Sequence, residues 1–226
     1  MEEPFRQAVD GRGAKYPDYA CTAIADAGSS LHAASRLHHT PSSCGSYNMP
    51  VKTSVVVMAG LPGTGKSTLA KLLSVELHGV VLDKDVIRAG LFPESRIEYS
   101  REQDDFCFEV LLETAAYLLR KDDPPDFLFL DGRTFAFHYQ MDRVLEWAST
   151  LGCPAKIIHT TCSDHSAQQR LAAPHPAKNR DFDAYLKLKA AFEQIDHPKL
   201  LVNTDEPITF SLQKCLGYLR GNTRSP

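Results

Sequence analysis

The residues with the clearest chemical potential form one glycine-rich run, Gly60-Leu61-Pro62-Gly63-Thr64-Gly65-Lys66-Ser67-Thr68. Its glycines allow backbone angles that other residues resist, so that successive amides can turn toward a phosphate. Lys66 brings a positive charge to the β- and γ-phosphates of a nucleoside triphosphate, and the Ser67 hydroxyl can ligate Mg²⁺. The run therefore predicts a phosphate-binding loop at the start of a helix. The alternative is a glycine turn with an incidental lysine.

A second polar group runs from Asp83 to Arg88, directly after a short apolar segment. Phosphoryl transfer to a hydroxyl needs a carboxylate that accepts the proton, and cations that stabilise the moving group. Asp85 is the candidate base, and Arg88, three residues later on a short helix, shares its face. Asp83 could serve instead, or could hold a water molecule of Mg²⁺. The alternative is structural, with Asp85 capping a helix and Arg88 in a surface ion pair.

Asp131 ends the apolar segment 127–131. An acid in this place lies beside magnesium in proteins with a phosphate loop, so we expect Asp131 to take part in metal binding, through water. The alternative is an ordinary strand-end aspartate that begins a turn with Gly132.

A polar helical stretch near residues 164–195 is interrupted by Pro174 and Pro176. Basic residues on an interrupted helix suit a lid that closes over nucleotide. Arg170 is the favoured lid contact, Lys178 and Arg180 stay open, and solvated helix charge is the alternative for all three. Weaker candidates for the acceptor pocket are Arg101, Arg133, His138 and Arg143.

These candidates follow the strands of an alternating pattern. Strands are predicted near 53–59, 80–83, 127–131, 155–159 and 200–202. Helices are predicted near 66–78, with Leu69, Leu72, Leu73 and Leu77 on one side, at 101–120 and 138–151, and within 164–195. A last helix is predicted to carry Leu212, Cys215, Leu216 and Leu219. The alternation predicts an α/β fold with a five-stranded parallel sheet, helices on both faces and a helical lid. In such folds ligands bind beyond the carboxyl ends of the strands.

Composition divides the chain and limits its function. Residues 1–50 are rich in Ala, Ser, Gly and His, and we expect a disordered extension before a domain at 51–222. Acidic residues in that extension argue against a transit peptide, and no leader or membrane-spanning run is recognisable, which favours a cytoplasmic protein. A net charge of −3 gives no overall attraction to nucleic acid or membrane. Six cysteines without a CxxC pair fit thiols in a reducing compartment.

Four segments carry a resemblance to a known family: GLPGTGKST at 60–68, the D-x-D-x-x-R run at 83–88, FLFLDGRTF at 127–135, and QQRL with the later YLKLKAAFEQID at 185–196. Over about 53–220 the chain resembles the AAA-domain P-loop kinases that include polynucleotide kinase and the zeta-toxin-like kinases. The resemblance implies a P-loop NTPase three-layer sandwich with ATP as donor. It also implies that Asp85 is the general base, that Arg88 contacts phosphate, and that Arg170 is the lid arginine.

The expected function is a Mg²⁺-dependent kinase that transfers the γ-phosphate of ATP to a hydroxyl of a small molecule or, less favoured, of a nucleic-acid end. Catalytic roles are expected for Lys66, Asp85, Arg88 and Arg170. The run 60–68 would bind the nucleotide, and Ser67 with Asp131 would position the metal. Two other functions stay open: a regulatory NTPase without a small acceptor, and a nucleic-acid-binding module. Neither the acceptor, nor ATP against GTP, nor the oligomeric state follows from the sequence.

Overall fold

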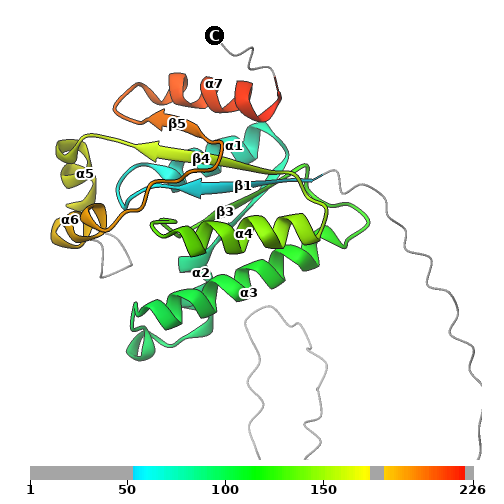
Figure 1. Ribbon diagram of the computed structural model, residues 1–226, viewed down its shortest axis with the longest axis horizontal. Helices are drawn as coiled ribbons and strands as arrows, with labels where there is room; N and C mark the ends of the chain where they lie inside the picture. The colour runs from blue at the N-terminus through cyan, green and yellow to red at the C-terminus, as the bar shows by residue number, and fades with distance from the viewer. Residues whose placement is uncertain (1–52, 174–180, 222–226) are drawn as a thin grey trace, which may run out of the picture. The chain divides into compact units, whose positions relative to one another are not determined.

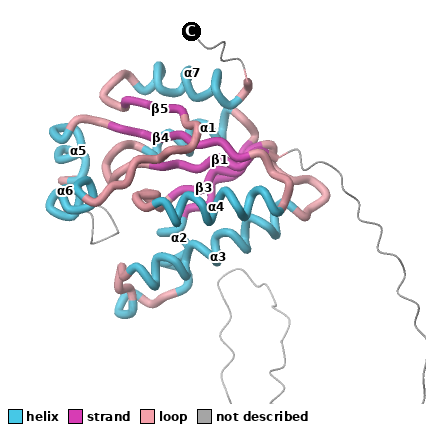
Figure 2. Tube along the Cα trace, viewed as in Figure 1, coloured by secondary structure: helices cyan, strands magenta, loops and turns pink. Residues whose placement is uncertain are grey.

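The computed structural model describes residues 53–173 and 181–221. Its strands are β1 (Ser54–Ala59), β2 (Gly79–Asp83), β3 (Phe127–Asp131), β4 (Ala155–Thr161) and β5 (Leu200–Asn203). Its helices are α1 (Lys66–Glu76), α2 (Lys84–Leu91), α3 (Arg101–Leu119), α4 (His138–Thr150), α5 (Asp164–Leu171), α6 (Phe182–Ala190) and α7 (Ile208–Leu219), with a 3-10 turn at Glu94–Arg96 (Figure 2). The expected extension at 1–50, and the lid candidates Lys178 and Arg180, lie outside the described residues.

All five strands are parallel and pair in the order β2-β3-β1-β4-β5. The predicted five-stranded parallel sheet is therefore confirmed. The register pairs Asp83 at the end of β2 with Asp131 at the end of β3. Because β1 lies in the centre and runs into the glycine loop, the loop leaves the sheet beside these two acids.

Helices cover both faces of the sheet (Figure 1). The side chains of β1 alternate between the two faces. Val55 and Val57 point into a core shared with α3 and α4. Val56 and Met58 point to the other face, where α1 and α7 pack. Since the strand is apolar toward both cores, it must be buried on both sides, as parallel strands usually are.

One expectation for α1 is wrong. Leu69 and Leu73 are fully buried as predicted, but Leu72 is 37% exposed, and Ala70 is buried in its place. The core of this face is bordered by α7, so the buried stripe of α1 is turned toward Ala70.

The polar stretch after β4 forms two short helices, α5 and α6. Asp181 caps α6 by accepting a hydrogen bond from the Ala184 amide at 2.7 Å. The buried Tyr185 joins the two helices, because its hydroxyl donates to Asp164 at 2.8 Å. The pair lies beyond the ends to which the strand arrows point, where the predicted lid belongs (Figure 1).

Within residues 53–173 and 181–221, every helix is too short or too polar to cross a bilayer.

Candidate functional site

The glycine loop turns sharply between β1 and α1. Gly60, Gly63 and Gly65 have φ values of 135°, 78° and 85°, a region that side chains disfavour. At Gly60 there is also no room, since a Cβ atom would lie 2.4 Å from the carbonyl oxygen of Thr160. Thr64 fixes the turn from within, because its hydroxyl donates to the Leu61 carbonyl at 2.7 Å. The loop therefore has a conformation that depends on its glycines.

Lys66 starts α1 and lies against this loop. Its amine donates hydrogen bonds to the carbonyls of Gly60 at 2.7 Å and Leu61 at 2.9 Å, and the residue is 9% exposed. Ser67 follows at the edge of a cavity, whereas Thr68 is exposed. The lysine and serine thus flank the N-terminus of α1, where helix geometry favours an anion.

Asp131 is an unusual buried acid. It is 1% exposed, and neither of its carboxylate oxygens has a hydrogen-bond partner among the described residues. Its neighbour in register is Asp83, and a Cβ atom on Gly132 would lie 2.4 Å from the Asp83 carboxylate. Two acids are thereby held close together, and such a pair is costly unless a cation or a proton offsets its charge.

The proximity of the two acids affects the pKa of Asp83. Burial raises its pKa above the usual range, and the negative charge of Asp131 raises it further. Its carboxylate accepts a hydrogen bond from the Asp85 amide at 2.8 Å, and this bond caps α2. Asp83 therefore faces Asp131 and caps the helix, and it is absent from the cavity wall that Asp85 lines.

The acidic pair suits Mg²⁺. This ion prefers oxygen ligands, keeps several water molecules, and commonly uses one or two carboxylates together with substrate phosphates. Asp131 supplies unpaired carboxylate oxygens, and Ser67 supplies a hydroxyl at the loop. The described residues contain no cluster of three or more His, Cys, Asp or Glu side chains that could hold a metal by themselves. The donor set thus fits an ion that arrives with a nucleotide.

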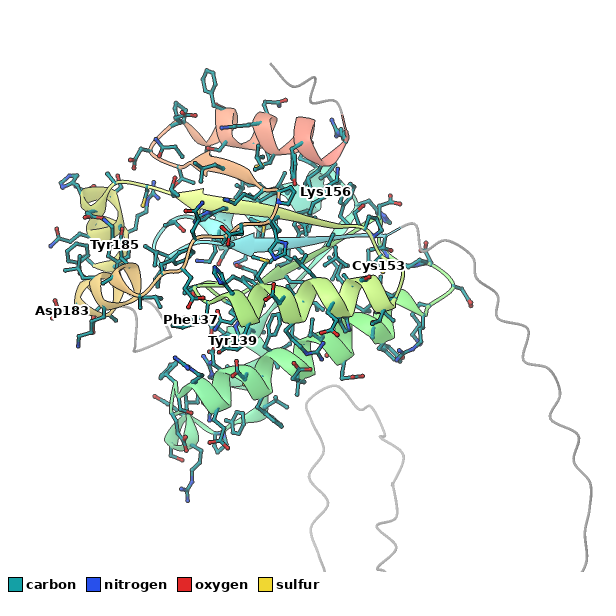
Figure 3. All side chains as sticks on the ribbon, in the orientation of Figure 1. Phe137, Tyr139, Cys153, Lys156, Asp183 and Tyr185 are labelled. Carbon is teal, nitrogen blue, oxygen red and sulfur yellow. The ribbon has the colours of Figure 1, made fainter. Side chains whose placement is uncertain are left out.

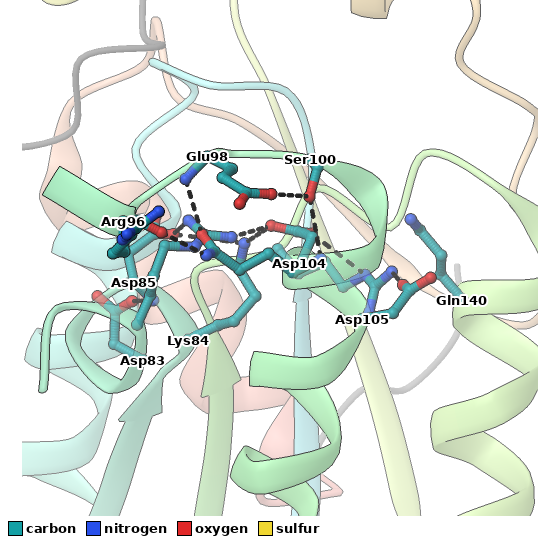
Figure 4. Close-up of polar contacts among 12 residues, drawn as sticks. Asp83, Lys84, Asp85, Arg96, Glu98, Ser100, Asp104, Asp105 and Gln140 are labelled. Carbon is teal, nitrogen blue, oxygen red and sulfur yellow. Dashed lines mark hydrogen bonds and ion pairs between the residues drawn. The ribbon is translucent and has the colours of Figure 1, made fainter. Parts of the chain in front are cut away.

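Asp85 and Arg88 lie together on α2, as their spacing predicted. A terminal nitrogen of Arg88 is 2.8 Å from the Asp85 carboxylate, whose side chain is 36% exposed (Figure 4). The structural alternative does not describe them, because Asp83 is the cap and Arg88 is 3% exposed. A half-exposed carboxylate beside a buried guanidinium can meet a hydroxyl in the cavity while staying oriented.

Sequence reasoning missed two members of this network, Lys84 and Asp104. The Asp104 carboxylate forms ion pairs with both Lys84 and Arg88 (Figure 4), and the Lys84 amine is 3.3 Å from Asp85. Arg133 pairs with Asp105 from the next position of α3. In the sequence, Asp104 and Asp105 lie near the start of a predicted helix, where the helix dipole favours acids. No local pattern therefore marked Asp104 as part of the site.

The segment just before α3 contains a residue in an uncommon backbone conformation. Tyr99 has a φ of 54°, and the Arg88 guanidinium lies 5.1 Å from the centre of its ring. Positive φ in a bulky residue is uncommon and is often found at binding sites. The turn brings Ser100 into position, and its side chain caps α3 by accepting from the Gln103 amide at 3.2 Å.

One cavity of about 500 Å³ joins these parts. It lies between the glycine loop, α2, the start of α3, the segment after β3, and α6. The residues that matter here are Lys66, Ser67, Lys84, Asp85, Arg88, Arg101, Asp104, Arg133, Phe137, Gln140 and Lys187. The predicted loop and the predicted Asp85–Arg88 pair thus share a single space.

Of the weaker arginine and histidine candidates for the acceptor pocket, two line the cavity and two do not. Arg101 and Arg133 line the cavity. His138 does not: its Nε2 atom is 2.8 Å from the Gln194 carbonyl, and this hydrogen bond is the main cause of its raised pKa. Arg143 forms an exposed ion pair with Glu109. Phe137 and Tyr139, at the start of α4, stack with centroids 6.2 Å apart (Figure 3).

Arg170 lies on the other side of the glycine loop. Its guanidinium donates to the carbonyl of Gly63 at 3.2 Å, and to the hydroxyl and carbonyl of Thr204, each at 2.8 Å. It therefore joins α5 to the loop and to the segment after β5. It does not line the 500 Å³ cavity in this structure.

Comparisons with known proteins identify the family and the fold. A family model described as AAA domain matches residues 55–195. The chain is similar to an adenylyl-sulfate kinase of Oceanobacillus iheyensis, with 26% identity over 75% of this chain and 85% of that protein.

Among solved structures, it is similar to the APS kinase of Mycobacterium tuberculosis in complex with AMPPNP and APS, with a TM-score of 0.58, 19% identity, and coverage of 76% of this chain and 99% of that one. It is also similar to a gluconokinase from Sinorhizobium meliloti, with a TM-score of 0.56, 14% identity, and coverage of 76% and 94%. At these identities, the two structures show a shared fold.

Proposed function

This chain belongs to the AAA-domain family of P-loop kinases, and from that premise we propose that it transfers the γ-phosphate of ATP to a hydroxyl group of a small molecule, with Mg²⁺. The observation that carries the proposal is the shared cavity, in which the phosphate loop and the Asp85–Arg88 pair face the same space. Relatives named for adenylyl sulfate and for gluconate act on small molecules, which supports a small acceptor over a nucleic-acid end.

The donor half consists of the loop 60–68 and the acids beside it. Loop amides and the N-terminus of α1 would bind the β- and γ-phosphates, and the Lys66 amine would leave its two carbonyl partners for phosphate oxygens. Ser67 and Asp131 would hold Mg²⁺, Asp131 through water. When bound, the ion neutralises charge that develops on the phosphates. Arg170, against Gly63, would clamp the loop once nucleotide is bound.

The acceptor half consists of Asp85 and its cations. The Asp85 carboxylate would accept the proton of the acceptor hydroxyl as the new oxygen–phosphorus bond forms and the bond from the γ-phosphorus to the β,γ-bridging oxygen breaks. Arg88 would stabilise the transferring group, and Asp104 holds it in place from α3. Lys84, paired with both Asp85 and Asp104, would keep the carboxylate oriented.

A regulatory NTPase without a small acceptor is the main alternative function. Such a protein has no need of a half-exposed carboxylate facing the phosphate loop across a cavity. The position of Asp85 therefore favours the kinase.

The test is a transfer assay with ATP labelled in its γ-phosphate and a panel of hydroxyl compounds: polyols, sugars, sugar acids, nucleosides and 5′-hydroxyl oligonucleotides. Lys66→Ala should lower transfer by about 10²-fold or more, because it removes a charge that faces the transferring phosphate. Lys71→Ala is the matched control, since Lys71 is an exposed lysine on the same helix.

Label that appears in a small-molecule product, and is lost in Lys66→Ala but not in Lys71→Ala, supports the proposal. Release of labelled phosphate at one rate with and without every acceptor would identify an NTPase instead. Label found only on oligonucleotides would move the acceptor to a nucleic-acid end.

A further inference from the structure

The buried cations of the acceptor half are paired with carboxylates of the protein. Three basic side chains there are 4% exposed or less, and each has at least one acidic partner. The three cations are Lys84, Arg88 and Arg133, and the three carboxylates are Asp85, Asp104 and Asp105. Burying charge requires such pairing. The three positive and three negative charges of this network therefore cancel.

Two further cations line the same cavity without a carboxylate partner among the described residues, Arg101 and Lys187. Arg101 is the first residue of α3, and its guanidinium lies 4.9 Å from the centre of the Phe137 ring. Lys187 comes from α6, on a different wall. Both are exposed. Arg101 and Lys187 are thus two positive charges of the cavity wall without a carboxylate partner among the described residues.

Gln140 adds an unsatisfied polar group to the wall. It is 6% exposed; its amide nitrogen is 3.3 Å from the Tyr139 hydroxyl, and its amide oxygen has no hydrogen-bond partner among the described residues. Exchanging the oxygen and nitrogen of this amide would still leave one end unpaired. A buried amide end without a partner is costly, so it marks a place for a polar ligand.

From this charge balance we propose that the acceptor of this kinase carries an oxyanion, a carboxylate, sulfate or phosphate group, which Arg101 and Lys187 bind from two walls of the cavity while Gln140 bonds a neighbouring polar group. The inference rests on the proposed function and names the class of its acceptor. An anionic group in the cavity would offset the charge of these two cations and would be attracted by them. A neutral polyol would leave both cations unpaired.

Lys187 has one competing role, because it shares the cavity with the phosphate loop and could bind the γ-phosphate. The experiment therefore fills the donor half first. Protein saturated with Mg²⁺ and a non-hydrolysable ATP analogue is titrated with inorganic sulfate, a probe that carries the oxyanion alone. Arg101→Gln and Lys187→Gln are compared with Arg143→Gln, which removes an exposed arginine outside the cavity.

We expect sulfate to bind the loaded protein, and each of the two cavity variants to weaken it by about tenfold, the effect of losing one charge-assisted hydrogen bond. Arg143→Gln should leave sulfate binding unchanged. With an acceptor taken from the transfer screen, the same two variants should raise its KM by about tenfold with little change in kcat, as for lost ground-state binding.

Several results would overturn the inference. Sulfate that fails to bind a protein already loaded with the analogue would do so, as would equal sulfate affinity in all variants. A Lys187→Gln variant that loses the analogue but keeps sulfate would assign Lys187 to the donor half. Failure of the analogue itself to bind is recorded in the first titration and would count against the proposed function instead.

Discussion

Four aspartates near the phosphate loop differ mainly in their partners. Asp104 and Asp85 pair with buried cations, Asp83 accepts from a backbone amide, and Asp131 has no hydrogen-bond partner among the described residues. The charge of a paired carboxylate is offset by its cation, whereas two neighbouring acids without a cation destabilise the fold. The difference in partners supports the proposal that Asp131, beside Asp83, belongs to the metal side and Asp85 to the acceptor side.

Asp83→Asn should raise the melting temperature measured at pH 7 without divalent cations, by about 2 °C, which corresponds to somewhat under 1 kcal/mol in a domain of this size. The folded state raises the pKa of Asp83, so folding loses stability as the pH rises from the ordinary value near 3.8 through the folded pKa. Asparagine removes the charge and still caps α2. The gain should therefore shrink as the pH falls toward 4.

Asp181→Asn is the matched control for this change, because Asp181 caps α6 from an exposed position. Thermal unfolding of both variants across the pH range separates loss of charge from loss of a cap. An Asp83→Asn protein that melts at or below the wild-type temperature at pH 7 would refute the strained acidic pair.

Individual site residues could be predicted from the sequence only where they belong to a contiguous motif. Gly60 to Ser67 and the spacing of Asp85 and Arg88 are local patterns, and the structure places these residues around one cavity. Asp104 and Lys187 have no such pattern. Their positions depend on how α3 and α6 pack, which no short run of residues records. Arg170 was expected to act as the lid arginine, and its observed contacts are with Gly63 and Thr204.

At the scale of elements, the site depends on helices that are held by apolar packing below it. α1 carries Lys66 and Ser67 at its first turn and buries Leu69 and Leu73 one and two turns later. The periodicity predicted this helix but placed Leu72 in the core, because a regular leucine spacing does not show which neighbouring helix the stripe will meet. In the structure, α1 packs against α7 as well as against the sheet.

Leu73→Ala should lower the free energy of unfolding by about 2–5 kcal/mol, the usual cost of a cavity at a fully buried leucine. Leu72→Ala, one position earlier and 37% exposed, should cost less than about 1 kcal/mol. Urea unfolding of the two variants measures the difference directly. Equal losses would show that the described face of α1 is wrong.

At the scale of the whole molecule, the site is assembled at the carboxyl edge of the sheet from segments far apart in the chain. The cavity takes residues from 62–67, 84–104, 132–140 and 184–191. Alternating strands and helices were enough to predict that these segments meet at one edge. The shape and charge of the cavity could not be predicted, since they arise from side chains that converge only after folding.

The central claim is that Asp85 is the base of a kinase whose donor half is independent of it. Phosphate transfer by Asp85→Asn, measured beside its ATP affinity, tests this most directly, with Asp123→Asn as a control at an exposed aspartate. Transfer should fall by about 10²- to 10⁴-fold, the usual contribution of a general base. ATP affinity should stay within about threefold of wild type, a change of less than 1 kcal/mol. A variant that transfers phosphate at the wild-type rate would contradict the claim.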